Sequence, residues 1–144
     1  TLVEPMNADA VCPLCQPQEE TVLWRNALLR VILVNDPHYP AFCRVIVNRH
    51  AKEMTDLAPD ERAQVMAAVW TVESVLRELL SPDKINLASL GNVVPHLHWH
   101  VIPRFADDRH FPDPVWAVPR REGVAHPVDV ARLRQRLAGL LGGA

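Results

Sequence analysis

Residues 96–102 read His-Leu-His-Trp-His-Val-Ile, and this alternation constrains the fold more than any other part of the 144-residue chain. Successive side chains on a β-strand point to opposite faces of the sheet. His96, His98 and His100 would therefore share one face, while the apolar side chains between them pack into the core. Because polar groups buried without partners are costly, a row of three imidazoles indicates a functional site.

Such a row of imidazoles suits two kinds of chemistry. Neutral imidazoles bind transition metals, and a His-x-His pair with one distant ligand can hold a zinc ion that activates water. Alternatively, one imidazole attacks phosphorus and forms a covalent intermediate, while its neighbours donate hydrogen bonds to the phosphate oxygens. The first chemistry gives a metallohydrolase and the second a nucleotidyl transferase or hydrolase, and the residues alone leave both open.

Hydrophobic periodicity along the rest of the chain predicts about five strands and two main helices. The strands are expected within 22–34 (two strands), at 42–49, 84–90 and 96–102, and the helices at 59–80 and 128–142. Gly91-Asn92 is expected to form the turn between the last two strands. This order favours an α+β fold, with helices on one face of an antiparallel sheet, over a parallel doubly wound sheet.

The charge balance limits the class of partner. The chain has 15 basic and 17 acidic side chains, which argues against a nucleic-acid polymer because such binding relies on clustered Lys and Arg. No apolar run approaches the roughly 20 residues that span a bilayer, and the first residues lack a secretory pattern. We therefore expect a cytoplasmic protein whose partner is a small molecule.

Cys12 and Cys15 form a Cys-x-x-Cys pair, which suits a metal or redox site in a reducing compartment. A redox pair usually precedes a helix that lowers the thiol pKa, and no helix is expected after this pair. Zinc is therefore favoured, with histidines completing the ligand set. Cys43, inside a predicted strand, is expected to be a small buried side chain.

Residues 96–102 fit the pattern His-φ-His-φ-His-φ-φ, where φ is apolar, and in this segment the chain resembles the histidine-triad superfamily. The resemblance extends upstream through residues 85–95 and 49–57 to the Cys-x-x-Cys pair. Residues 12–105 thus resemble one histidine-triad domain of the bacterial branch. Residues 1–11 would then be a tail, and residues 106–144 a C-terminal segment with a short helix that packs on the domain or on a dimer partner.

The resemblance implies a function as well as the HIT-like fold. It implies a homodimer in which His98 attacks the α-phosphate of a nucleoside phosphoramidate or dinucleoside polyphosphate, and water then releases a nucleoside monophosphate. His96 and His100 would complete the catalytic set, with His100 against the phosphate or the leaving group. Nucleotide contacts would come from Asn86, Gly91, Asn92, Val93, His98 and His100.

The resemblance also implies a structural zinc ion and marks two departures from the familiar pattern. The ligands would be Cys12, Cys15, His50 and His96, and four protein ligands leave no open coordination position. Val93 stands where eukaryotic members carry Ser or Thr, and Phe42 stands where some members carry a further histidine. Both departures concern the choice of leaving group.

Two alternatives remain beside the nucleotidyl-transfer hypothesis. One is a zinc metallohydrolase that uses the three histidines as metal ligands, and the other is a nucleotide-binding module with little turnover. Arg104 either offsets phosphate charge or lies solvated at the surface. His110, in the proline-rich segment after the histidine row, is expected at the surface.

Overall fold

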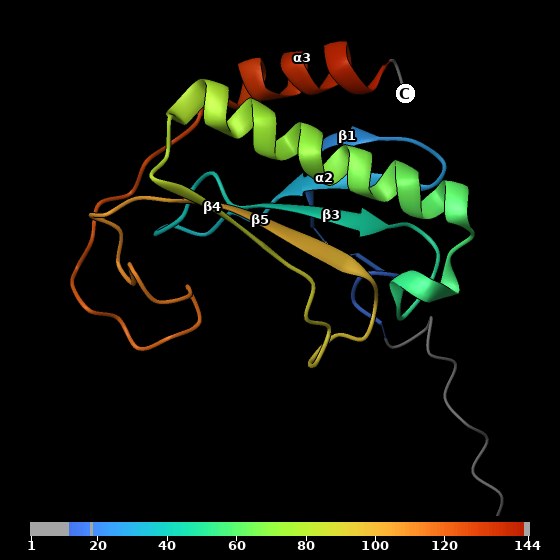
Figure 1. The fold of residues 1–144 in the computed structure, drawn as a ribbon, viewed down its shortest axis with the longest axis horizontal. Coiled ribbons are helices and arrows are strands. Elements are labelled where there is room, and N and C mark those ends of the chain that lie inside the picture. The colour runs from blue at the N-terminus through green and yellow to red at the C-terminus, as the bar shows by residue number, and fades with distance from the viewer. Residues whose placement is uncertain (1–11, 18, 143–144) are drawn as a thin grey trace, which may run out of the picture.

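The computed structural model describes residues 12–17 and 19–142, and at its centre lies a five-stranded antiparallel sheet (Figure 1). The strand order is β1-β2-β3-β5-β4. The strands are β1 (Thr21–Arg25), β2 (Leu29–Leu33), β3 (Cys43–Val47), β4 (Lys84–Ala88) and β5 (His98–Arg104). The predicted α+β fold is confirmed, while the predicted tail at 1–11 lies outside the described residues.

Both long helices, α2 (Pro59–Leu80) and α3 (Val130–Leu141), cover the same face of the sheet (Figure 1). Helix α2 has the predicted bounds because Pro59 suits a first turn, and Ser81, with φ of 46°, ends the helix in a left-handed conformation. Its buried side chains pack on the apolar face of the strands to form the main core. They are Val65, Ala68, Val69, Val72, Val75 and Leu76.

The connection between β4 and β5 differs from the prediction. The strand expected to begin at residue 96 begins at His98, and a loop of residues 89–97 replaces the expected tight turn. Pro95 has no N–H to donate, and the N–H of His96 is used in a turn to the carbonyl of Val94 at 2.8 Å. Strand pairing therefore starts after both residues, and β5 runs on to Arg104.

The face opposite the helices carries the polar residues of β5. His98, His100 and Arg104 alternate along this strand, and Arg44 of the neighbouring strand β3 stands directly beside His100 in the sheet register. A 3-10 helix, η1 (Met54–Asp56), precedes α2. The sheet therefore separates an apolar core on its helical face from a polar site on its other face.

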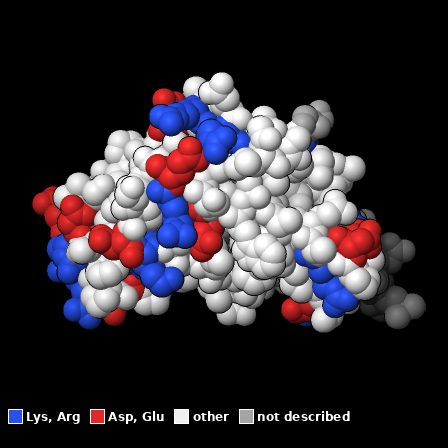
Figure 2. All heavy atoms as spheres, turned by 45° about the horizontal axis from the view of Figure 1, so that its top comes forward, with Lys and Arg blue, Asp and Glu red and all other residues white. Residues whose placement is uncertain are grey.

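Charged side chains do not form a broad area of one sign on the face that carries the helices. Lys and Arg lie beside Asp and Glu in small groups there (Figure 2), in keeping with the net charge of −2. In the described part of the chain, neither helix combines the length and the apolar character needed to cross a membrane.

Candidate active site

His98, the first residue of β5, is held in one tautomer by its own backbone. Its ring Nδ1 lies within hydrogen-bond distance of the carbonyl oxygen of His96. A carbonyl can only accept, so Nδ1 carries the proton and Nε2 keeps its lone pair. Burial lowers the pKa of His98, although the hydrogen bond to His96 partly opposes this shift. At neutral pH the ring is a neutral imidazole with an unprotonated Nε2.

His100 follows on the same face, and its ring meets that of His98 edge-on with centroids 4.9 Å apart. Arg44 donates its Nε–H to His100 Nδ1 at 3.4 Å, which leaves the proton of the neutral ring on Nε2. Burial and then the positive charge of Arg44 lower the pKa of His100 to about 4. His100 is therefore a neutral hydrogen-bond donor at pH 7.

These side chains open into a groove of about 380 Å³ on the polar face of the sheet. The groove is lined by Arg44, His98 and His100 of the sheet, by residues 90–94 of the loop between β4 and β5, and by Trp116. The volume falls in the range of small-ligand pockets. The groove therefore brings two neutral imidazoles and one guanidinium to a space that fits a phosphorylated ligand.

The predicted nucleotide-binding residues are divided between the groove and its surroundings. Gly91, Asn92 and Val93 line the groove, and Gly91 has a φ of 67°, which favours glycine. Val93 is 93% exposed at the rim. Asn86 lies outside the groove, where its side-chain oxygen accepts a hydrogen bond from Arg104 Nη1 at 2.8 Å. Its contact with a nucleotide stays a prediction.

His96 lies apart from the groove, in a cluster with Cys12, Cys15 and His50 whose possible ligand atoms all lie within 4.8 Å of one another. Its Nε2 donates to the carbonyl of Val47 at 2.6 Å, so Nδ1 holds the lone pair. That Nδ1 is 3.3 Å from the sulfur of Cys12 and 3.3 Å from the sulfur of Cys15.

The separations within this cluster are close to those of a tetrahedral metal site. Donor atoms about 2.0–2.3 Å from a tetrahedral zinc ion lie roughly 3.3–3.8 Å from one another. The sulfur of Cys15 lies 3.2 Å from Nδ1 of His50, close to this range. The tautomer of His96 also turns a lone pair toward both sulfurs, so two sulfurs and two nitrogens could hold a metal ion here.

Two polar residues beside the site are buried, contrary to expectation. Arg104 is 2% exposed and makes a two-bond ion pair with Asp108, so it is not a solvated charge. His110 is 7% exposed, and its Nδ1 lies 2.6 Å from the hydroxyl of Tyr39. His110 was expected at the surface because sequence patterns place loop residues there, whereas Arg104 was expected either against a phosphate or solvated at the surface. Cys43 is fully buried as predicted, and burial raises its pKa to about 12.

Sequence reasoning missed two residues of the groove, Arg44 and Trp116. Arg44 interrupts an otherwise apolar strand, Cys43–Val47, and a charged side chain among buried neighbours is a signal that could have identified it. Trp116 gave no such signal, since it lies in an irregular proline-rich segment.

The comparisons with known proteins agree with this fold. A family model described as the HIT domain matches residues 16–107. The chain belongs to the HIT family. A solved histidine triad protein from Bradyrhizobium japonicum is 32% identical, with a TM-score of 0.68, over 85% of this chain and 90% of that one. A Zn-bound histidine triad family protein from Mycobacterium smegmatis shares the fold, with 20% identity and a TM-score of 0.59 over 92% and 94% of the two chains.

Two curated relatives carry names of enzymes. An AP-4-A phosphorylase of Mycobacterium tuberculosis is 29% identical over 69% of this chain and 54% of its own length. A bis(5'-nucleosyl)-tetraphosphatase (asymmetrical) of Schizosaccharomyces pombe is 29% identical over 61% of this chain and 51% of its own. The chain thus spans about half the length of the curated relatives it matches.

Proposed function

We propose that this HIT domain is a nucleotidyl hydrolase or transferase that acts on the α-phosphate of a nucleotide conjugate through His98. The observation that carries the proposal is the tautomer of His98. Its Nδ1 proton is committed to the carbonyl of His96, so the lone pair of Nε2 is available for attack on phosphorus. The names of the curated relatives, which concern dinucleoside tetraphosphates, support this class of substrate.

The reaction would proceed in two displacements. In the first, Nε2 of His98 forms a bond to the α-phosphorus, and the leaving group departs with the electrons of the bond that breaks; a leaving ammonia takes up the proton it needs from solvent. In the second, a water oxygen bonds to phosphorus as the P–N bond breaks, which frees a nucleoside monophosphate and restores neutral His98. The protons of the attacking water stay on the phosphate product or pass to solvent. Attack by inorganic phosphate in place of water would make the second step a phosphorolysis.

Arg44 and His100 would stabilise the charge that builds up on the phosphate oxygens. The Arg44 guanidinium lies beside His100, and the neutral ring of His100 offers an Nε2–H donor. Backbone groups of residues 91–95 would also hold the phosphate. Asn86, Asn92 and Val93 are proposed to lie near the ribose and the phosphate.

We propose that the cluster of Cys12, Cys15, His50 and His96 holds a structural zinc ion. Four protein ligands close its coordination sphere, so the ion would stabilise the fold and fix His96. That in turn would fix the carbonyl of His96, which sets the tautomer of His98. No step of the reaction needs the metal.

The metallohydrolase alternative fits the groove less well. A catalytic zinc ion on the histidines of the groove would lie beside the guanidinium of Arg44, which is 3.4 Å from Nδ1 of His100. Like charges at such distances repel strongly where water is excluded. The same guanidinium favours a phosphate, so the charge of the groove supports phosphoryl chemistry.

The remaining parts of the proposal concern assembly and location. We propose that residues 12–105 form the catalytic HIT domain, that residues 106–144 pack on it or on a partner copy, and that the protein is a cytoplasmic homodimer. The resemblance to the family implies the dimer, and the edge strands β1 and β4 offer backbone groups to which a partner copy would pair.

The test is release of AMP from adenosine 5'-phosphoramidate by wild-type protein and by His98→Ala, with zinc assayed on both samples. We expect turnover by the wild type, and an inactive variant that keeps its zinc. Loss of zinc together with activity would favour the metallohydrolase. Nucleotide binding without release of AMP by the wild type would favour a binding module.

A further inference from the structure

Trp116 is an exposed aromatic side chain fixed over the histidine groove. Its indole is 54% exposed, and its ring centroid lies 5.3 Å from that of His100 at an interplanar angle of 67°. The indole also borders a second hollow along β4, which is lined by Pro112 and Pro114. A large apolar ring that reaches both the groove and open solvent offers a stacking surface to a ligand.

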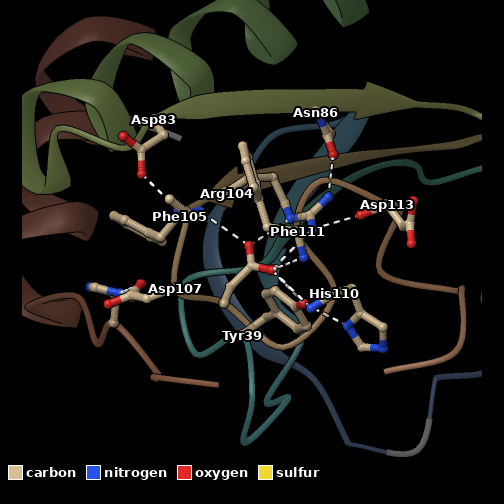
Figure 3. Close-up of polar contacts among 12 residues, drawn as sticks. Tyr39, Asp83, Asn86, Arg104, Phe105, Asp107, His110, Phe111 and Asp113 are labelled. Carbon is tan, nitrogen blue, oxygen red and sulfur yellow. Dashed lines mark hydrogen bonds and ion pairs between the residues drawn. The ribbon is translucent and has the colours of Figure 1, made fainter. Parts of the chain in front are cut away.

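The segment that carries Trp116, residues 105–121, is anchored by a buried polar network (Figure 3). Asp108 is 1% exposed, and its carboxylate accepts two bonds from Arg104 and one from the hydroxyl of Tyr39. It also accepts three bonds from backbone N–H groups, those of Phe105, His110 and Phe111. The start of the segment is therefore fixed to β5.

The residues on either side of Trp116 are fixed as well. The carbonyl of Asp113 accepts a bond from Arg104 at 2.7 Å, and Val115 packs against a small cluster that includes Phe42. After Trp116, the N–H of Ala117 donates to the carbonyl of Pro114, and the N–H of Arg120 donates to the carbonyl of Arg109. The position of the indole is thus set by the fold.

The tautomer of His98 indicates which end of a substrate would meet this indole. Nδ1 points back to the carbonyl of His96, and the two ring nitrogens point in diverging directions, so Nε2 faces away from His96. An in-line displacement sends the leaving group to the far side of phosphorus from Nε2. Along the groove, the ring of His100 lies beside that of His98, with centroids 4.9 Å apart, and the indole of Trp116 lies 5.3 Å from the ring of His100. A leaving group that departs past His100 would therefore meet the indole.

We infer that Trp116 is a leaving-group contact, on which the base of a departing nucleotide stacks, and that the groove therefore favours dinucleoside polyphosphates over conjugates with small leaving groups. This inference rests on the proposed function. Stacking of one base on an aromatic side chain contributes about 1–3 kcal/mol, which corresponds to roughly 5- to 150-fold in a rate or binding constant.

The experiment compares kcat/KM for two substrates that share the transferred adenylyl group. Diadenosine tetraphosphate has an aromatic leaving group, whereas adenosine 5'-phosphoramidate releases only ammonia. For Trp116→Ala we expect kcat/KM to fall about 5- to 150-fold with the tetraphosphate and to change less than twofold with the phosphoramidate. Trp116→Phe should retain most of the wild-type kcat/KM with the tetraphosphate. Trp70→Ala is the matched control, because Trp70 is 59% exposed on α2, away from the groove.

Each contrary result has a separate meaning. An equal loss with both substrates would overturn the inference, since the indole would then contact the transferred nucleotide. An unchanged kcat/KM for the tetraphosphate, or wild-type turnover of the phosphoramidate alone, would also overturn it while leaving the proposed function intact. Wild-type protein that turns over neither substrate would overturn both.

Discussion

Asp108→Asn tests how strongly the buried network holds the segment that carries Trp116. Asp108 and Arg104 are 1% and 2% exposed. Burial by itself would raise the pKa of the Asp108 carboxyl, but the Arg104 guanidinium and backbone N–H donors hold it well below its usual range. Asparagine keeps the shape but removes the negative charge, which leaves the Arg104 charge buried without its partner.

Breaking a buried ion pair in this way costs about 3–5 kcal/mol, a large part of the stability of a typical domain. In a urea titration with a slope near 2 kcal/mol per M, the midpoint should fall by roughly 2 M. Asp113→Asn is the control, because its ion pair with Arg120 is 39% and 50% exposed and such pairs contribute at most about 1 kcal/mol. A loss for Asp108→Asn no greater than that of the control would refute the reasoning.

Three further predictions concern the groove and the metal cluster. The pKa of His100 is about 4 in the folded protein, whereas that of an unfolded histidine is near 6.5. As the pH drops from 6.5 to 4, the unfolded state binds this proton first, so His100 should lower the free energy of unfolding by about 3 kcal/mol. Urea unfolding curves measured across this pH range check the prediction. Arg44→Ala should raise the pKa of His100 and move the acid limb of the kcat/KM profile to higher pH; a shift to lower pH would contradict the assignment. Cys12→Ser should lose metal in elemental analysis and lower Tm, while Cys43→Ala should retain the metal because Cys43 lies in the core.

The parts of this molecule that sequence predicts well are those with a local signal. The bounds of α2 follow from apolar residues that recur every three or four positions and from Pro59 at its start. The pairing of His98 and His100 on one face follows from strand geometry, because residues two apart in a strand point the same way.

The parts that sequence does not predict depend on contacts between distant segments. Tyr39 and Asp108 are 69 residues apart, and nothing periodic in the proline-rich segment indicates that they meet. Arg104 was expected at the surface or against phosphate, because a charge is rarely buried unless a partner is supplied. Asp108, four residues after Arg104, supplies that partner. Their ion pair fixes the start of the segment that carries Trp116 to the groove.

The central claim is a covalent bond between His98 and the nucleotide. The most direct measurement is a millisecond alkaline quench of wild-type protein turning over diadenosine tetraphosphate, followed by mass spectrometry of its peptides. We expect one nucleotidyl group on the peptide that contains His98, formed as fast as turnover and missing from His98→Ala. Full turnover with no adduct, or an adduct that persists in His98→Ala, would contradict the claim.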